Sequence, residues 1–324
     1  MKANIYLSIL CLSLTMLSAC SKKKNEDSAK QVDSVKDLSI SQPLVSHIYT
    51  ADPSAHVFND RIYIYPSHDI EAGTPENDNG DHFDMRDYHI LSMDSIGGEV
   101  TDHGVAIDIK NIPWAGRQLW APDAAYANNT YYLYFPVKDK EDIFRIGVAT
   151  STKPEGPFIA EPKPITNSYS IDPAVFKDDD GAFYMLPRVA KLSSDMKQFA
   201  EEVKEVKLVD ENGNLFTESQ NDKRFFEAAW MHKFNGKYYF TYSTGDTHFI
   251  NYAIGDSPYG PFTYKGVVLH AVQGWTNHHS IVEIKGKWYL FYHDVQLSGK
   301  THLRNVKVTE LKHNEDGSIE AIKP

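Results

Sequence analysis

Hydrophobic and polar positions alternate along most of the chain in short runs that are rich in tyrosine and phenylalanine, and turn residues separate these runs. The clearest case is 231–242, where Asn235-Gly236 joins two alternating segments. Asn-Gly supplies the two positive φ values of a tight turn, so this stretch predicts a β-hairpin. No long segment keeps an apolar period of 3.6 residues, and helix should therefore be scarce.

The hairpin belongs to a unit that occurs five times, each time with an ionisable head, a turn and an aromatic strand. The five heads are Asp52, Asp123, Asp172, Glu227 and His278. Successive heads lie 71, 49, 55 and 51 residues apart, near the roughly 40–50 residues of a propeller blade. The pattern predicts an all-β, five-bladed β-propeller whose inner strands start at one central funnel. The alternative is a β-sandwich of five unrelated hairpins.

The beginning of the chain has a different character. The apolar run 5–17 is too short to span a bilayer and predicts a secretory signal over 1–19. Leu17-Ser18-Ala19-Cys20 resembles a bacterial lipobox, which implies lipidation of Cys20 and a membrane tether. The alternative is a chance cysteine in an ordinary signal peptide.

Residues 20–42 are polar and rich in lysine, aspartate and serine, which predicts a flexible linker. Residues 43–324 are expected to form the propeller domain. On this interpretation the protein is a secreted lipoprotein, held at the periplasmic face or the outer surface of a bacterium only through its lipid.

The net charge of −11 disfavours binding to the phosphate backbone of nucleic acids, whereas a neutral glycan is unaffected by it. Three heads, Asp52, Asp172 and Glu227, lie in apolar or proline-containing contexts, and such surroundings raise the pKa of a carboxyl group. Glycoside hydrolysis needs two carboxyl groups, one protonated and one ionised. The alternative is that Asp52-Pro53 and Asp172-Pro173 only open a strand or turn.

With these contexts the chain resembles glycoside hydrolase family 43, in its β-xylosidase/α-L-arabinofuranosidase branch, from about residue 45 to the end. The matching stretches are 51–58 (ADPSAHVF), 65–69 (YPSHD), 120–123 (WAPD), 170–176 (SIDPAVF) and 225–230 (FFEAAW). The resemblance implies a five-bladed propeller and hydrolysis with inversion. It also implies that Asp52 is the general base, that Glu227 is the general acid, and that Asp172 orients Glu227 and raises its pKa.

The resemblance further implies that His278 lies near the axis, with a hydrated calcium ion or as a residue that only hydrogen-bonds neighbouring blades or substrate. Trp120 is expected at the rim as a sugar platform, and Arg304 is expected to point at the catalytic carboxylates. Trp230 and Trp288 are expected in the propeller core.

The expected activity is that of an exo-acting β-D-xylosidase acting on xylo-oligosaccharides of plant hemicellulose, with α-L-arabinofuranosidase activity as a second expectation. The alternatives are an endo-arabinanase and a non-catalytic glycan-binding lipoprotein. One stretch departs from the resemblance: in 181–192 the aromatic strand meets the next segment almost directly. Blade three should therefore lack a strand or have a truncated loop, which would open the funnel wall beside Asp172.

Overall fold

The computed structural model describes residues 42–168 and 170–324. The predicted signal peptide, the lipidation site Cys20 and all but the last residue of the predicted linker lie outside these residues. No helix in the described part of the chain is both long enough and apolar enough to pass through a membrane.

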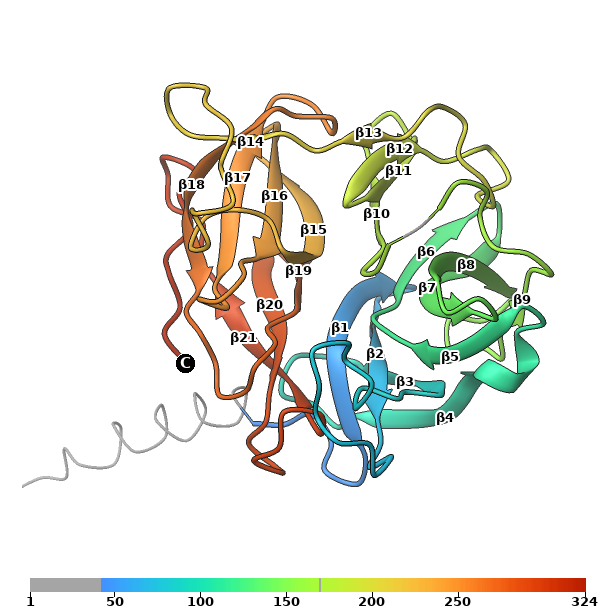
Figure 1. The fold of residues 1–324 in the computed structure, drawn as a ribbon. Coiled ribbons are helices and arrows are strands. Elements are labelled where there is room, and N and C mark those ends of the chain that lie inside the picture. The colour runs from blue at the N-terminus through green and yellow to red at the C-terminus, as the bar shows by residue number, and fades with distance from the viewer. Residues whose placement is uncertain (1–41, 169) are drawn as a thin grey trace, which may run out of the picture. The chain divides into compact units, whose positions relative to one another are not determined.

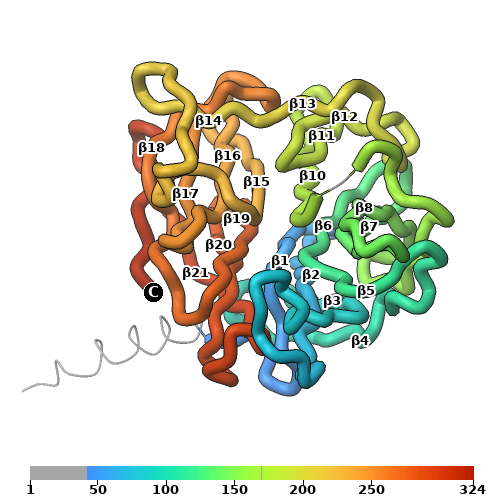
Figure 2. Tube along the Cα trace, viewed as in Figure 1, coloured from blue at the N-terminus to red at the C-terminus, as the bar shows by residue number. Residues whose placement is uncertain are grey.

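Five β-sheets form a ring in chain order, so that the colour in Figure 1 runs round the ring from blade 1 in blue to blade 5 in red. Along the tube in Figure 2, the strands of one blade follow one another before those of the next blade begin. Helix in the described residues amounts to one 3-10 turn, η1 (Ile109–Asn111). The prediction of an all-β, five-bladed propeller is confirmed.

The blades differ in their number of strands. Blade 1 contains β1 (Tyr49–Phe58), β2 (Arg61–Asp69), β3 (Asp87–Met93) and β4 (Thr101–Asp108). Blade 2 contains β5 (Ala115–Leu119), β6 (Asp123–Ala127), β7 (Thr130–Asp139), β8 (Phe144–Ser151) and β9 (Ile159–Ala160). Blade 3 contains β10 (Ala174–Lys177), β11 (Phe183–Leu186), β12 (Arg188–Lys191) and β13 (Lys204–Glu205). Blade 4 contains β14 (Leu208–Val209), β15 (Glu227–Phe234), β16 (Lys237–Ser243), β17 (Ile250–Gly255) and β18 (Phe262–Leu269). Blade 5 contains β19 (His279–Ile284), β20 (Lys287–Asp294) and β21 (Asn305–Leu311).

The innermost strand of each blade begins at or within two residues of a predicted head, or contains it, and a tight turn leads to the second strand. In four blades the turn is a residue pair with positive φ, as a turn between right-twisted strands requires. The pairs are Asn59-Asp60, Asn128-Asn129, Asn235-Gly236 and Lys285-Gly286.

Aromatic residues of the strands fill the space between the sheets, and each fully buried ring contributes about 1.5–3 kcal/mol. The buried tyrosines also satisfy their hydroxyl groups. Tyr65 of blade 1 donates to the Pro154 carbonyl of blade 2 at 2.8 Å, and Tyr134 of blade 2 donates to the Met196 carbonyl at 2.8 Å. The abundance of tyrosine therefore joins neighbouring blades by both apolar and polar contacts.

Asp123, the head of blade 2, links three blades through hydrogen bonds. The buried Asp123 carboxylate accepts hydrogen bonds from the Ser54 hydroxyl and, at 2.7 Å, from His56 Nε2, both in blade 1. It also accepts the backbone N–H of Val175 in blade 3 at 2.5 Å. These contacts use both carboxylate oxygens to hold the inner strands together.

The ends of the described chain pack onto the last two blades. The Leu44 N–H donates to the Val306 carbonyl of β21 at 2.9 Å, which brings the first described residues to blade 5. Near the other end, the Ile322 N–H donates to the Val268 carbonyl of β18 at 2.8 Å. The last residues of the chain therefore lie beside β18, in the outer part of blade 4.

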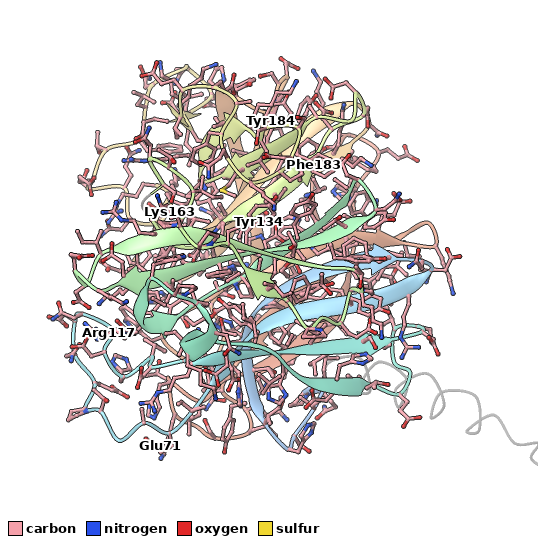
Figure 3. All side chains as sticks on the ribbon, turned by 90° about the vertical axis from the view of Figure 1, so that its right-hand side faces the viewer. Glu71, Arg117, Tyr134, Lys163, Phe183 and Tyr184 are labelled. Atoms are coloured by element: carbon pink, nitrogen blue, oxygen red, sulfur yellow. The ribbon has the colours of Figure 1, made fainter. Side chains whose placement is uncertain are left out.

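Blade 3 has the truncated loop that the sequence predicts, because Pro187 alone separates β11 from β12. It does not lack a strand, although all four strands are short; Phe183 and Tyr184 of β11 are labelled in Figure 3. The predicted opening beside Asp172 is wrong, since Asp172 is only 5% exposed. Leu186 of the short blade belongs to one apolar cluster with residues of blade 4.

Candidate active site

A cavity of about 220 Å³ lies where the inner strands start. The six site residues that the sequence predicts in the propeller all line this cavity, and they come from all five blades or from the segments that connect them. They are Asp52, Trp120, Asp172, Glu227, His278 and Arg304. Residues separated by up to 252 positions are therefore neighbours.

Unusual backbone conformations position the acids. Asp52 and Asp172 have φ values of 49° and 56°, and Ala228, which follows Glu227, has 56°. β1 and β15 each carry a bulge at this point, because the pairing with the second strand shifts between Ala51 and Ser54 and again between Glu227 and Trp230. A bulge re-aims the side chain next to it. Blades 1 and 4 thus use the same device to turn a carboxylate toward the cavity.

Asp52 is held as a carboxylate. Arg304 Nη1 donates to Asp52 Oδ1 at 2.8 Å, and the Ser67 hydroxyl donates to Oδ2 at 2.7 Å. Burial alone would raise the pKa of Asp52, but the Arg304 guanidinium opposes it, and with help from nearby histidines and Ser67 the pKa falls to about 2. Asp52 is therefore ionised at any pH above the acid range and can accept a proton.

Arg304 is itself fixed by a second carboxylate. Its Nε and Nη2 donate to the two oxygens of Asp69, each at 2.8 Å, and its guanidinium lies 4.9 Å from the centre of the Phe83 ring. Burial would lower the pKa of Arg304, yet Asp52 and Asp69 raise it above its usual value. The forked geometry suits an arginine and not a lysine.

The pKa of Glu227 is shifted in the opposite direction to that of Asp52. Burial raises the pKa of Glu227 well above its usual value, and the carboxylates of Asp172 and Asp52 raise it further, while Arg304 acts against them. Asp172 accepts the Ala228 N–H at 2.8 Å, which fixes the backbone directly after Glu227. The pKa of Asp172 is also raised, mainly by burial. Burial and the neighbouring carboxylates thus both favour a protonated carboxyl group at Glu227.

Two histidines lie beside Asp52. His278 Nδ1 is 3.7 Å from Asp52 Oδ1, at the axis as predicted. His293 Nδ1 accepts the Asp52 N–H at 3.0 Å, and its Nε2 is 3.2 Å from the Thr276 carbonyl. Burial first, and then Arg304, lowers the pKa of His293 to about 3, so its ring is neutral and can accept this bond.

The sequence analysis assigned no role to Ser67, Asp69 or His293. Ser67 and Asp69 lie in the stretch 65–69, and their spacing of two puts both side chains on one face of a strand. That alternation was the one feature of the sequence from which their shared position could have been predicted. His293 lies near the end of the aromatic strand β20, as many other residues of this chain lie in aromatic strands, and nothing in the sequence distinguished it.

The tryptophans divide between rim and core. Trp120 lines the cavity and is held there by a hydrogen bond from its Nε1 to the Phe83 carbonyl at 2.7 Å. Trp275 also lines the cavity and is 52% exposed. Trp230 is buried and donates to the Ile281 carbonyl, and Trp288 packs against the same core, so the core predictions for these two are confirmed.

This arrangement places a carboxyl group with a lowered pKa and one with a raised pKa in the same cavity, as glycoside hydrolysis requires of its pair of acids. The profile of glycosyl hydrolases family 43 matches residues 40–319. The chain belongs to glycoside hydrolase family 43.

Relatives of known activity agree with this assignment. The chain is 56% identical to xylosidase/arabinosidase 43A of Humicola insolens, over 87% of this chain and 99% of that protein. A solved structure of a family 43 β-xylosidase/α-arabinofuranosidase from a compost microbial metagenome, in complex with xylotriose and in a calcium-free form, is 64% identical. It covers 88% of this chain and 97% of its own, with a TM-score of 0.87. An enzyme of the same family from Xanthomonas citri, complexed with xylotriose, is 48% identical over 91% of this chain and 97% of its own, with a TM-score of 0.84.

Proposed function

We propose that the protein is an exo-acting, inverting β-D-xylosidase that also hydrolyses α-L-arabinofuranosides. The observation that carries the proposal is that Asp52, whose pKa is lowered, and Glu227, whose pKa is raised, line one cavity. The names of the family 43 relatives support the substrate class, because they include xylosidases and arabinosidases at more than 50% identity.

In this mechanism Asp52 takes the proton of an attacking water while Glu227 protonates the departing glycosidic oxygen. Arg304 keeps Asp52 ionised without itself donating a proton. Asp172 acts as a positioning residue: its bond to the Ala228 N–H fixes the strand start, and its charge holds the proton on Glu227. Inversion requires room for water, so we expect the carboxyl groups of Asp52 and Glu227 to lie roughly 6.5–9.5 Å apart.

The size of the cavity supports removal of terminal sugars. Its volume of about 220 Å³ is below the roughly 300–1,000 Å³ of pockets that enclose drug-sized ligands. It suits one sugar ring and the bond to the next. Trp120 and the exposed Trp275 give the ring apolar faces to stack on.

The function is tested by proton NMR of xylobiose hydrolysis, beside assays with 4-nitrophenyl β-xyloside, 4-nitrophenyl α-arabinofuranoside and linear arabinan. We expect xylose whose first-formed anomer is α, hydrolysis of both aryl glycosides, and little action on arabinan. A first-formed β anomer would reject inversion. Rapid shortening of arabinan would favour the endo-arabinanase, and binding of xylobiose without turnover would favour the glycan-binding protein.

We further propose that His278 holds a hydrated calcium ion at the axis. The donor set fits such an ion only if water supplies most ligands, because Ca²⁺ prefers six to eight oxygens and Asp52 already uses both of its oxygens on Arg304 and Ser67. His278 would hold the hydrated ion in place, and the ion would add positive charge beside the attacking water. His278 needs no proton for this role.

Removal of calcium is therefore expected to lower kcat several-fold, and its return should restore the rate. The melting temperature should change little, because water and not the protein supplies most ligands. The comparison is made between chelator-treated and calcium-loaded enzyme on 4-nitrophenyl β-xyloside. Unchanged kinetics after complete chelation would leave His278 as a hydrogen-bonding residue only.

We also propose that Cys20 carries a lipid and tethers the enzyme to a bacterial membrane, as residues 17–20 suggest. A chain expressed in a bacterium with radiolabelled palmitate should incorporate label and sediment with membranes. The Cys20→Ser chain should do neither. Equal labelling of the two chains would contradict the anchor.

A further inference from the structure

A second group of titratable side chains lies on the face of β2 that points away from the cavity. The Ser67 and Asp69 side chains bind Asp52 and Arg304 in the active site. Successive side chains of a strand point to opposite faces, so His68 is directed away from that site. The function proposed above leaves His68 and its neighbours unused.

His68, Asp87 and His89 each offer one metal-binding atom, and these atoms all lie within 4.8 Å of one another. His68 is the next-to-last residue of β2, and the two others lie on the adjacent strand β3. His68 Nδ1 is 2.6 Å from Asp87 Oδ1, and the centres of the two imidazole rings are 4.6 Å apart. The three side chains are 14–21% exposed, so a dissolved ion can reach them.

Asp102 on β4 orients one of the two imidazoles. Its two carboxylate oxygens lie 3.0 and 3.1 Å from His89 Nδ1. Nδ1 therefore carries the hydrogen and donates, which leaves the Nε2 lone pair free. A histidine that donates one ring N–H to a carboxylate and offers its other nitrogen is the usual arrangement of a metal ligand.

We propose that His68, Asp87 and His89 bind a divalent transition metal ion such as Zn²⁺, with Asp102 as the carboxylate that orients His89. Two imidazoles and one carboxylate suit zinc and its neighbours, whereas Ca²⁺ prefers oxygen ligands. At bond lengths of about 2.0–2.1 Å, tetrahedral ligand atoms lie about 3.4 Å apart. Side-chain rotations that bring the most distant atoms about 1.4 Å closer complete the set, and water takes the fourth position.

The ion would link β2, which carries Ser67 and Asp69 on its other face, to the neighbouring elements of blade 1. It joins β2 to β3, and Asp102 on β4 also binds His47 Nε2 at 2.7 Å, in the segment that precedes β1. The site therefore holds together β2, β3, β4 and the segment before β1. Because the ligands face away from the cavity, the ion is structural and is distinct from the calcium proposed at His278.

The test is zinc binding by the full chain after treatment with chelator, in buffer that contains excess calcium. Zinc is measured by equilibrium dialysis and elemental analysis, with Co²⁺ absorption as a report of the ligand set. We expect the wild type to bind one more zinc per chain than His89→Gln. Zinc should raise the melting temperature of the wild type by at least about 2 °C and leave that of the variant unchanged.

Two further variants sharpen the test. Asp102→Asn keeps all three ligands and should weaken zinc binding about 10- to 100-fold. His103→Gln removes an exposed histidine of β4 outside the group and should bind zinc as the wild type does. The proposal would be overturned if the wild type and His89→Gln bound the same amount of zinc. It would also be overturned if His89→Gln and His103→Gln lost zinc binding to the same extent. If His89→Gln does not fold, unchanged affinity in Asp102→Asn would overturn it.

Discussion

Replacing Glu227 by alanine is expected to lower kcat on xylobiose by about 10²- to 10⁴-fold, because a positioned general acid contributes this much. The sugar that leaves xylobiose is a poor leaving group and needs a proton in the transition state. Nitrophenolate leaves without one, so 4-nitrophenyl β-xyloside should lose far less activity. Steady-state rates on the two substrates, measured in parallel, give the comparison.

The matched control is Glu283→Ala, which removes an exposed glutamate from the inner strand β19. It should leave both rates within about twofold of the wild type. Equal losses on xylobiose and on the aryl xyloside in Glu227→Ala would mean that Glu227 does not donate the proton. The pH profile adds a second check: in the wild type the alkaline limb follows loss of the Glu227 proton, and this limb should vanish with the aryl xyloside in the variant.

Arg304→Met is expected to lower both the stability of the protein and its rate. It leaves Asp52 and Asp69 buried and without their shared cation, and breaking a buried pair in this way costs about 3–5 kcal/mol. The fraction of the Arg304→Met protein that still folds should show at least about a 100-fold loss of kcat. Burial then acts on Asp52 without the guanidinium, so the pKa of Asp52 rises. Since Asp52 must be ionised to act as a base, the acid limb of kcat/KM should move to higher pH.

Arg304→Lys separates charge from geometry. Lysine restores the positive charge but cannot donate to both oxygens of Asp69 and to Asp52 at once, so its rate should fall between those of the wild type and Arg304→Met. Arg86→Met removes an exposed arginine that pairs with Asp84 and should leave the rate and the pH profile unchanged. An acid limb that stays in place in Arg304→Met would show that Arg304 does not set the pKa of Asp52.

The repeated heads sufficed to predict the five blades, since an ionisable residue, a turn and an aromatic strand are local features. They could not separate the roles of the heads. Asp123 and Asp172 both begin inner strands, yet the oxygens of Asp123 bind blades 1 and 3, whereas Asp172 accepts the N–H beside Glu227. That difference depends on which backbone groups of another blade face each carboxylate, and sequence spacing does not contain it.

The residues that hold Asp52 and its partner Arg304 in place were predicted only in part, for the same reason. Arg304 was expected at the carboxylates and lies there, but its bidentate partner Asp69 and the neutral His293 were not assigned. The short connection in blade 3 was evident from the sequence. Its consequence was not, because the burial of Asp172 depends on how blade 3 packs in the folded ring, which the sequence does not contain.

The joints between the blades limit how such an enzyme can diversify. Asp172 holds blade 3 to the strand start of blade 4, and its carboxylate also raises the pKa of Glu227. A mutation at such a strand start changes assembly and chemistry together, so selection cannot adjust either one alone. The rim, with Trp275 exposed at its edge, is under a weaker constraint. New substrate ranges in this scaffold should therefore arise by exchange of rim loops around an unchanged ring of strand starts, and laboratory evolution of this enzyme is best directed there.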